Sequence, residues 1–195
     1  GLLAVVGLAV HSWYFRPLSA RIFYERVFIQ TAVDSPEMIS SMRLLPGWLD
    51  WTTDELDDYS LAAGDRGVRQ LEDALATLRG YDRDVLSDPL SYDVLEYFLA
   101  TQVEGTRFRY HNAPLNQLFG IQSNLPTFLA TQHPVADAGD AEDYLARLGE
   151  FPRISDEVMQ GLRHRESLGL RPQTFVVEKV LAEMRGFTGQ APTEN

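Results

Sequence analysis

The spacing of apolar residues along most of the chain is that of amphipathic helices. Between Ser60 and Leu78, the apolar positions 68, 71, 75 and 78 fall on one helical face. A similar pattern follows Asp88-Pro89. No run of alternating apolar and polar residues predicts a strand, and no internal repeat is visible. The sequence therefore predicts an all-α protein built from antiparallel helical hairpins or a bundle.

Capping residues and prolines indicate where these helices begin and end. Asp34-Ser35-Pro36-Glu37 combines a cap, an early proline and an acid in the first turn, which predicts a helix start. Gly169 is a candidate for the left-handed residue that follows a helix. The predicted helices span residues 19–33, 36–45, 60–78, 88–103, 137–150, 154–168 and 172–186.

Two segments depart from the helical pattern. Residues 48–59 are rich in Asp and Glu but lack the glycine and the ligand spacing of a calcium loop, so we interpret them as a solvated acidic connector. Residues 110–134 are rich in amides and contain Pro114, Gly120 and Pro126. This composition predicts loops rather than a single helix.

The first fifteen residues carry no charge, and the first charged residue is Arg16. Fifteen residues of helix reach about 22 Å, less than the ~30 Å hydrocarbon core of a bilayer. The segment fits the h-region of a signal peptide, a helix buried in the protein's own core, or the outer end of a transmembrane helix. Trp13 and Tyr14 directly before Arg16 match an aromatic belt at a membrane interface, so we favour a membrane anchor over residues 1–16.

Charge is unevenly distributed along the chain. The net charge is −11, whereas residues 1–33 hold three arginines against one glutamate. The acidic body repels phosphates, which argues against nucleic acid as a partner. The arginines after the apolar segment favour a cytoplasmic body only if nothing basic precedes it, so charge alone does not fix the orientation. The absence of cysteine excludes disulfides and thiolate chemistry in this chain.

A search for catalytic motifs finds no complete active site. A helical zinc hydrolase needs two histidines one turn apart, and His11, His111, His133 and His164 are too widely spaced. A Gly-x-Ser-x-Gly elbow and the common phosphate-binding glycine loops are also missing. The sequence therefore predicts no catalytic residue, metal ligand or cofactor site in this chain.

Donor and acceptor side chains concentrate in the amide-rich segment, where they could orient a ligand. The alternative is that they cap the turns and helix ends of this region, which need the same groups. The candidate ligand-binding residues are Arg109, Tyr110, His111, Asn116, Gln117 and Gln122.

Several motifs, in order, resemble the N-terminal part of a bacterial family catalogued as domain of unknown function 885. The resemblance runs from about Phe23-Tyr24-Glu25-Arg26 to the end of the chain. It is carried by Ser91-Tyr92-Asp93-Val94-Leu95, Phe108-Arg109-Tyr110-His111, Pro114-Leu115-Asn116-Gln117-Leu118-Phe119-Gly120, Asp140-Ala141-Glu142-Asp143-Tyr144-Leu145-Ala146-Arg147-Leu148 and Phe175-Val176-Val177-Glu178.

This resemblance implies a helical protein similar to zinc metallopeptidases and typically exported or membrane-attached. It favours a body in the periplasm and an anchor in the inner membrane. The family's metal motif, a His-Glu pair followed by Pro-Gly-His-His, lies downstream of the matched region and has no counterpart in this chain. Zinc is therefore expected only in a downstream part of a full-length protein.

Two functional hypotheses follow. The first is the N-terminal helical portion of a membrane-anchored, metallopeptidase-like protein of unknown substrate. The second is a non-catalytic accessory subunit, whose N-terminal helix packs against the transmembrane helices of a larger complex. In both, residues 1–16 form the anchor, residues 17–59 the juxtamembrane helices and acidic connector, and residues 60–195 the helical domain.

Overall fold

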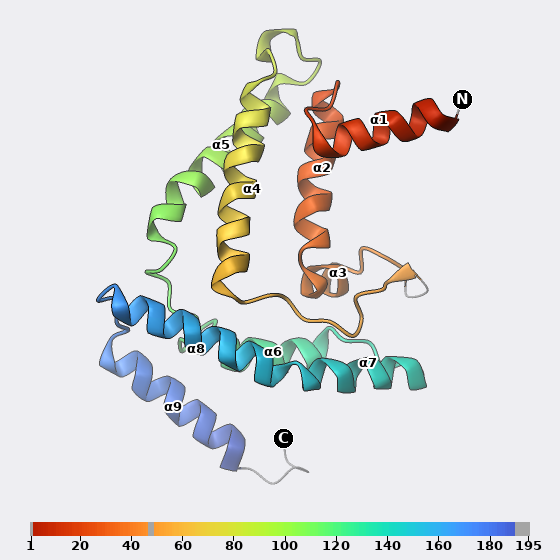
Figure 1. Cartoon of the computed structure of the whole chain (residues 1–195). Coiled ribbons are helices and arrows are strands. Elements are labelled where there is room, and N and C mark those ends of the chain that lie inside the picture. The colour runs from red at the N-terminus through yellow and green to blue at the C-terminus, as the bar shows by residue number, and fades with distance from the viewer. Residues whose placement is uncertain (1, 47–48, 190–195) are drawn as a thin grey trace. The chain divides into compact units, whose positions relative to one another are not determined.

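A computed structural model describes residues 2–46 and 49–189, and within them every regular element is a helix (Figure 1). The all-α prediction is therefore confirmed. The elements are α1 (Leu2–Tyr14), α2 (Ala20–Val33), α3 (Pro36–Met42), α4 (Leu61–Arg79), η2 (Arg83–Val85), α5 (Pro89–Gly105), η3 (Thr106–Phe108), α6 (Ile121–Thr131), α7 (Ala138–Gly149), α8 (Phe151–Ser167) and α9 (Thr174–Gly189).

These helices form two compact units that interleave in the sequence. Unit 1 contains the described parts of residues 1–35 and 62–107, and unit 2 those of residues 36–61 and 108–195. Helices α1, α2, α4 and α5 thus belong to unit 1, and α3 and α6 to α9 to unit 2. The chain crosses from one unit to the other three times, so neither unit is a continuous stretch of sequence.

Most predicted helix ends are found close to their expected positions. Asp88 caps α5, because its carboxylate accepts the backbone N–H of Ser91 at 3.1 Å. Gly169 has φ +76°, as predicted for a left-handed residue after α8. The N–H groups of Gly169 and Leu170 donate to the carbonyls of Glu166 and Arg165, each at 2.9 Å, which is the Schellman pattern of helix termination.

Helix α6 corrects part of the prediction for residues 110–134, because Pro126 was expected to interrupt a helix there. Pro126 lies inside this helix, where it removes one backbone hydrogen bond. Leu125, Phe128 and Leu129 are buried along one face of α6, and this burial offsets the lost bond. The helix predicted over residues 36–45 is also shorter than expected, because Arg43 has φ +49° and directly follows α3.

The core of unit 1 lies between α2, α4 and α5. Phe23 is fully buried against Leu78 and Leu99. The ring of Tyr81 packs near Phe23, and its hydroxyl donates to the carbonyl of Pro17 at 2.6 Å. These contacts fix the beginning of α2, the end of α4 and the middle of α5 with respect to one another.

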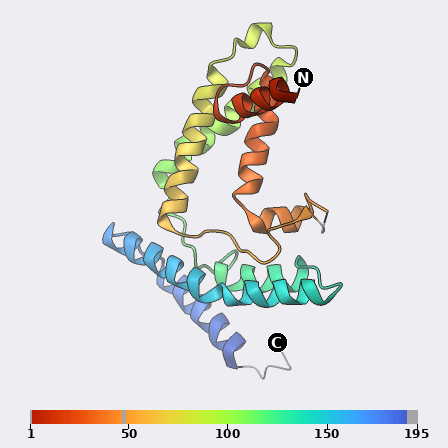
Figure 2. The ribbon, with the colours of Figure 1, turned by 45° about the vertical axis from the view of Figure 1, so that its right-hand side comes forward.

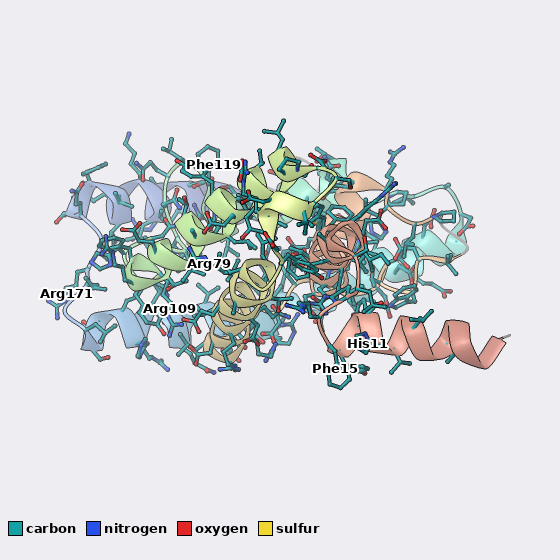
Figure 3. The ribbon with its side chains drawn as sticks, turned by 90° about the horizontal axis from the view of Figure 1, so that it is seen from above. His11, Phe15, Arg79, Arg109, Phe119 and Arg171 are labelled. Carbon is teal, nitrogen blue, oxygen red and sulfur yellow. The ribbon has the colours of Figure 1, made fainter. Side chains whose placement is uncertain are left out.

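The apolar side chains of α1 whose burial the structure describes are exposed. Val6, Leu8 and Val10 are 51%, 54% and 50% exposed. Phe15, at the end of the segment, extends away from the ribbon (Figure 3). The interpretation of this segment as a helix buried in the protein's own core is therefore wrong for these residues. No helix in the described part of the chain is long and apolar enough to cross a membrane.

A single arginine attaches the end of α1 to α2. The Nη1 group of Arg26 donates to the carbonyls of Ser12, Trp13 and Phe15 at 3.0, 3.2 and 2.6 Å. These are carbonyls that a helix end leaves without partners, and a guanidinium satisfies several of them at once. The exit direction of the apolar helix is thus set by one cation of α2.

The core of unit 2 lies between α6, α8 and the acidic segment before α4; Figure 2 shows α6 and α8 from a second side. Leu56 packs against buried side chains of both helices and is 5% exposed. Thr52 is also buried. The acidic segment is therefore not a simply solvated connector, since its described residues contribute side chains to this core. The buried cluster consists of Leu56, Leu125, Phe128, Leu129, Ile154 and Val158.

Candidate functional site

Unit 2 contains a fully buried arginine, Arg147 of α7, which is 0% exposed. Its Nη2 group donates to Ser40 Oγ at 2.7 Å and to the carbonyl of Thr52 at 3.0 Å. Its Nε donates to the carbonyl of Glu55 at 2.8 Å. The guanidinium also lies 5.1 Å from the centre of the Phe128 ring. Arg147 thus connects α3, the acidic segment and α6 at one point.

His133 completes the surroundings of this arginine. A guanidinium can only donate, so the 2.8 Å contact between Arg147 Nη1 and His133 Nδ1 makes Nδ1 an acceptor. The 2.8 Å contact from His133 Nε2 to the carbonyl of Asp140 then places the ring proton on Nε2. Burial lowers the pKa of Arg147, and the carboxylates of Asp50 and Glu37 act in the opposite direction. The cluster is satisfied internally, which indicates a structural role.

A second polar group surrounds Glu37 of α3. Its carboxylate accepts the hydroxyl of Tyr59 at 3.0 Å and the backbone N–H of Asp57 at 3.2 Å. Burial and the nearby Asp57 carboxylate raise the pKa of Glu37 above its ordinary value of 4.5. Burial and the Glu37 carboxylate in turn raise the pKa of the Tyr59 hydroxyl. This group ties the start of α3 to the end of the acidic segment.

The raised pKa of Glu37 gives a pH-dependent contribution to stability. The folded protein holds this proton more tightly than the unfolded chain, so the contribution is lost as the pH rises from 4.5 through the raised pKa. Glu37→Gln removes the titration. We expect the unfolding free energy of the original protein to fall, relative to that of Glu37→Gln, across this interval and to run parallel above it. Urea titrations between pH 4 and pH 8 measure the difference, and a constant offset over the whole range would contradict the prediction.

The structure separates the predicted ligand-binding residues into two groups. Tyr110 and His111 line a pocket of about 450 Å³ in unit 2. Arg109 lies beside them, with its guanidinium 4.6 Å from the centre of the Tyr110 ring and Nη2 donating to the Tyr110 hydroxyl at 2.7 Å. These three neighbours therefore form one part of a candidate binding site.

The amide side chains mainly hold the local turn. Asn116 Oδ1 accepts the backbone N–H groups of Leu118 and Phe119 at 2.9 and 2.8 Å. Gln122 Nε2 donates to the carbonyl of Asn116 at 2.7 Å and to the carboxylate of Glu183 at 3.0 Å. Gln117 is exposed. Asn116 and Gln122 thus form the turn contacts of the alternative interpretation, and their ligand binding stays a prediction.

The pocket is built mostly by the end of α8 and the turn after it. The Schellman turn contributes Gly169 and Leu170, and α8 supplies Met159 and Leu162 from its apolar side. Sequence reasoning missed three cationic residues that line this pocket; the Arg-His-Arg run at 163–165 was the available signal. These residues are Arg163, Arg165 and Arg171.

Aromatic and cationic groups are layered at one edge of the pocket. The Tyr110 ring meets the His164 ring edge-on, with the centroids 4.7 Å apart. The guanidinium of Arg165 lies 5.6 Å from the centre of the Tyr110 ring. Burial lowers the pKa of Arg165, which lines the pocket together with Tyr110. Arg171 extends away from the ribbon in Figure 3 and pairs with Glu166 at 3.2 Å.

The described residues do not fit a zinc site. Within residues 2–46 and 49–189, no group of three or more His, Asp or Glu side chains lies close enough together to hold a metal ion.

The predicted membrane-interface residues lie at the end of α1 and just after it. Tyr14 is 74% exposed, and Trp13 is also exposed. The guanidinium of Arg16 lies 5.5 Å from the centre of the Tyr81 ring and donates to the carbonyl of Gly80. Arg16 is therefore held by unit 1, whereas the two aromatic rings are available to an apolar environment. Their membrane contact stays a prediction.

Comparison with known proteins gives one family. The family model described as bacterial protein of unknown function (DUF885) matches residues 36–195. No curated protein and no solved structure matches the chain.

Proposed function

Because the chain belongs to the bacterial DUF885 family of unknown function, we propose that it is the N-terminal helical portion of a membrane-anchored, metallopeptidase-like protein. In this proposal unit 2 binds and orients the substrate, and zinc chemistry belongs to a downstream part of the full-length protein. The described residues supply no metal-binding cluster for that chemistry. The metallopeptidase character is proposed from the resemblance of the sequence motifs.

The observation that carries the proposal is the pocket beside Tyr110 and His111. It combines an apolar side, formed by Met159 and Leu162, with several hydrogen-bond donors at its edge. Pockets that bind small ligands typically have this composition, a mostly apolar lining with a few oriented polar groups. Unit 2 would accordingly form one wall of the substrate site.

Hydrolysis by the full-length protein tests this proposal. The full-length protein, expressed from its gene and purified, is expected to cleave members of a peptide library. A metal chelator should abolish this activity. Tyr110→Ala is expected to raise KM several-fold with little change in kcat, because the tyrosine binds substrate without taking part in the chemistry. Tyr97→Ala, at an exposed tyrosine of α5, is the matched control. Cleavage with unchanged KM in Tyr110→Ala would count against a binding role for the pocket.

The membrane part of the proposal rests on α1. Its half-exposed apolar residues include Val6, Leu8 and Val10, and a hydrophobic surface of this kind is costly in water. We place the anchor in the inner membrane and the body in the periplasm, following the typical location of the similar proteins. Accessibility of an engineered cysteine at exposed Gln117 to a membrane-impermeant thiol reagent, in cells with an opened outer membrane, tests this orientation.

The same exposed helix supports the second hypothesis, an accessory subunit held by transmembrane helices of a larger complex. Such a subunit would co-purify with membrane proteins in fixed stoichiometry from mild detergent. Deletion of residues 2–15 should then release the partners. Recovery of the intact protein without partners, together with chelator-sensitive hydrolysis, would favour the first hypothesis.

A further inference from the structure

The pocket beside Tyr110 gathers positive charge on an acidic protein. Arg163, Arg165 and Arg171 line it together with one carboxylate, that of Glu166. The lining thus has a formal excess of two positive charges, whereas the whole chain carries −11. An anionic ligand is repelled by most of this protein and attracted to this place. The sign of the local charge therefore points to an anion.

Two of the three arginines have donors to offer. Arg163 is exposed, and within the described residues no hydrogen bond or ion pair holds its guanidinium. Arg165 uses Nε and one Nη1 hydrogen for the carbonyls of Asn112 and Gly161, at 3.2 and 3.1 Å. Its Nη2 group is then available to a ligand. Paired N–H groups of a guanidinium match the two oxygens of a carboxylate.

The remainder of the pocket selects an apolar group next to that anion. Met159, Leu162, Leu170 and Pro172 line it, and Leu162 and Leu170 are half-buried. A volume of about 450 Å³ lies within the range of small-ligand pockets. A ligand with a charged end and an apolar side chain satisfies both parts of this lining.

We propose that this pocket binds the terminal carboxylate of a peptide, with an apolar last side chain. Arg163 and Arg165 hold the carboxylate, and the side chain lies on Leu162 and Leu170. The identification of the ligand as a peptide rests on the proposed function. The negative charge and the apolar neighbour are argued from the pocket alone.

Binding of small probes to the full-length protein tests this inference. Isothermal titration with N-acetyl-L-leucine, with its uncharged amide and with inorganic phosphate separates charge from shape. The acid is expected to bind at least about tenfold more tightly than the amide, because only the acid forms charge-assisted hydrogen bonds. Phosphate is expected to bind more weakly than the acid, since it gains nothing from the apolar lining.

Substitution of Arg163 identifies the cation. Arg163→Gln is expected to lower the affinity for the acid about tenfold and to leave the affinity for the amide unchanged. Arg163→Lys is expected to retain part of the affinity for the acid. Arg185→Gln, which removes an exposed arginine of α9 outside the pocket, is the matched control. Since Arg163 is exposed, its replacement leaves the fold intact, and circular dichroism verifies this.

The outcomes separate this inference from the proposed function. Equal affinity for acid and amide, or equal effects of the Arg163 and Arg185 replacements, would overturn the carboxylate site. Phosphate binding as tight as that of the acid would also overturn it. Selective binding of the acid without any chelator-sensitive peptide hydrolysis would instead contradict the proposed function and leave the carboxylate site standing.

Discussion

Arg147→Met is expected to lower the unfolding free energy of unit 2 by about 3–5 kcal/mol. The methionine fills much of the space but donates no hydrogen bond. It therefore leaves the carbonyls of Thr52 and Glu55 and the ring nitrogen of His133 buried without their partner. Urea unfolding followed by circular dichroism measures the loss. Hydrogen exchange of the α6 to α8 amides assigns the loss to this unit.

Two variants control this experiment. Arg185→Met makes the same replacement at an exposed position of α9 and is expected to change stability by less than about 0.5 kcal/mol. Arg147→Lys keeps the charge but loses the planar fork of donors, so its stability should lie between those of the original protein and Arg147→Met. A stability of Arg147→Met equal to that of the Arg185 control would show that the buried hydrogen bonds contribute little.

Leu8→Asp tests the proposed membrane anchor, and we expect it to release the full-length protein from lipid vesicles. Leu8 is 54% exposed in α1, so the change removes no core packing from either unit. A carboxylate in an apolar membrane segment costs about 3 kcal/mol, which corresponds to a loss of about a hundredfold in partitioning. Flotation of the full-length protein with lipid vesicles measures the bound fraction, and thermal unfolding verifies that the fold is unchanged.

The matched control for this experiment is Leu90→Asp in α5. Leu90 is 71% exposed in unit 1 and lies outside the proposed anchor. This variant is expected to float with the vesicles like the original protein. If both variants float equally well, α1 does not provide the attachment, and the exposed apolar helix needs another explanation. If both are lost from the vesicles, the binding surface extends beyond α1.

Sequence periodicity predicted those helices whose apolar faces and caps are local. Asp88 and Gly169 marked helix limits, because a cap or a left-handed turn acts within a few residues. Helix α6 is hard to predict from sequence, because Pro126 and the amides disfavour a helix where the apolar positions 125, 128 and 129 favour one. Burial of those positions depends on Leu56 and Ile154, which are distant in sequence.

The sequence predicts only part of the pocket beside Tyr110 and of the cluster around Arg147. Tyr110 and His111 were predicted because donors concentrate near them, and the structure places both in the pocket. Arg163 and Arg165 have the sequence pattern of ordinary surface residues on an amphipathic helix. Their neighbours in α8 do not show that the distant segment around Tyr110 lies beside them in the pocket. Arg147 is similar: a lone arginine in a helix gives no sign that Ser40, 107 residues earlier, will accept its hydrogen bond.

The interleaving of the two units also has a consequence during synthesis on the ribosome. The backbone N–H of Tyr59 donates to the carboxylate of Glu157, 98 residues later. At translation rates of about 5–20 residues per second, the acidic segment therefore waits about 5–20 s for that partner to be made. Leu56 waits as well, because the buried residues of its core cluster in α6 and α8 are made after it. The segment between α3 and α4 consequently reaches its folded contacts only after α6 and most of α8 have been made.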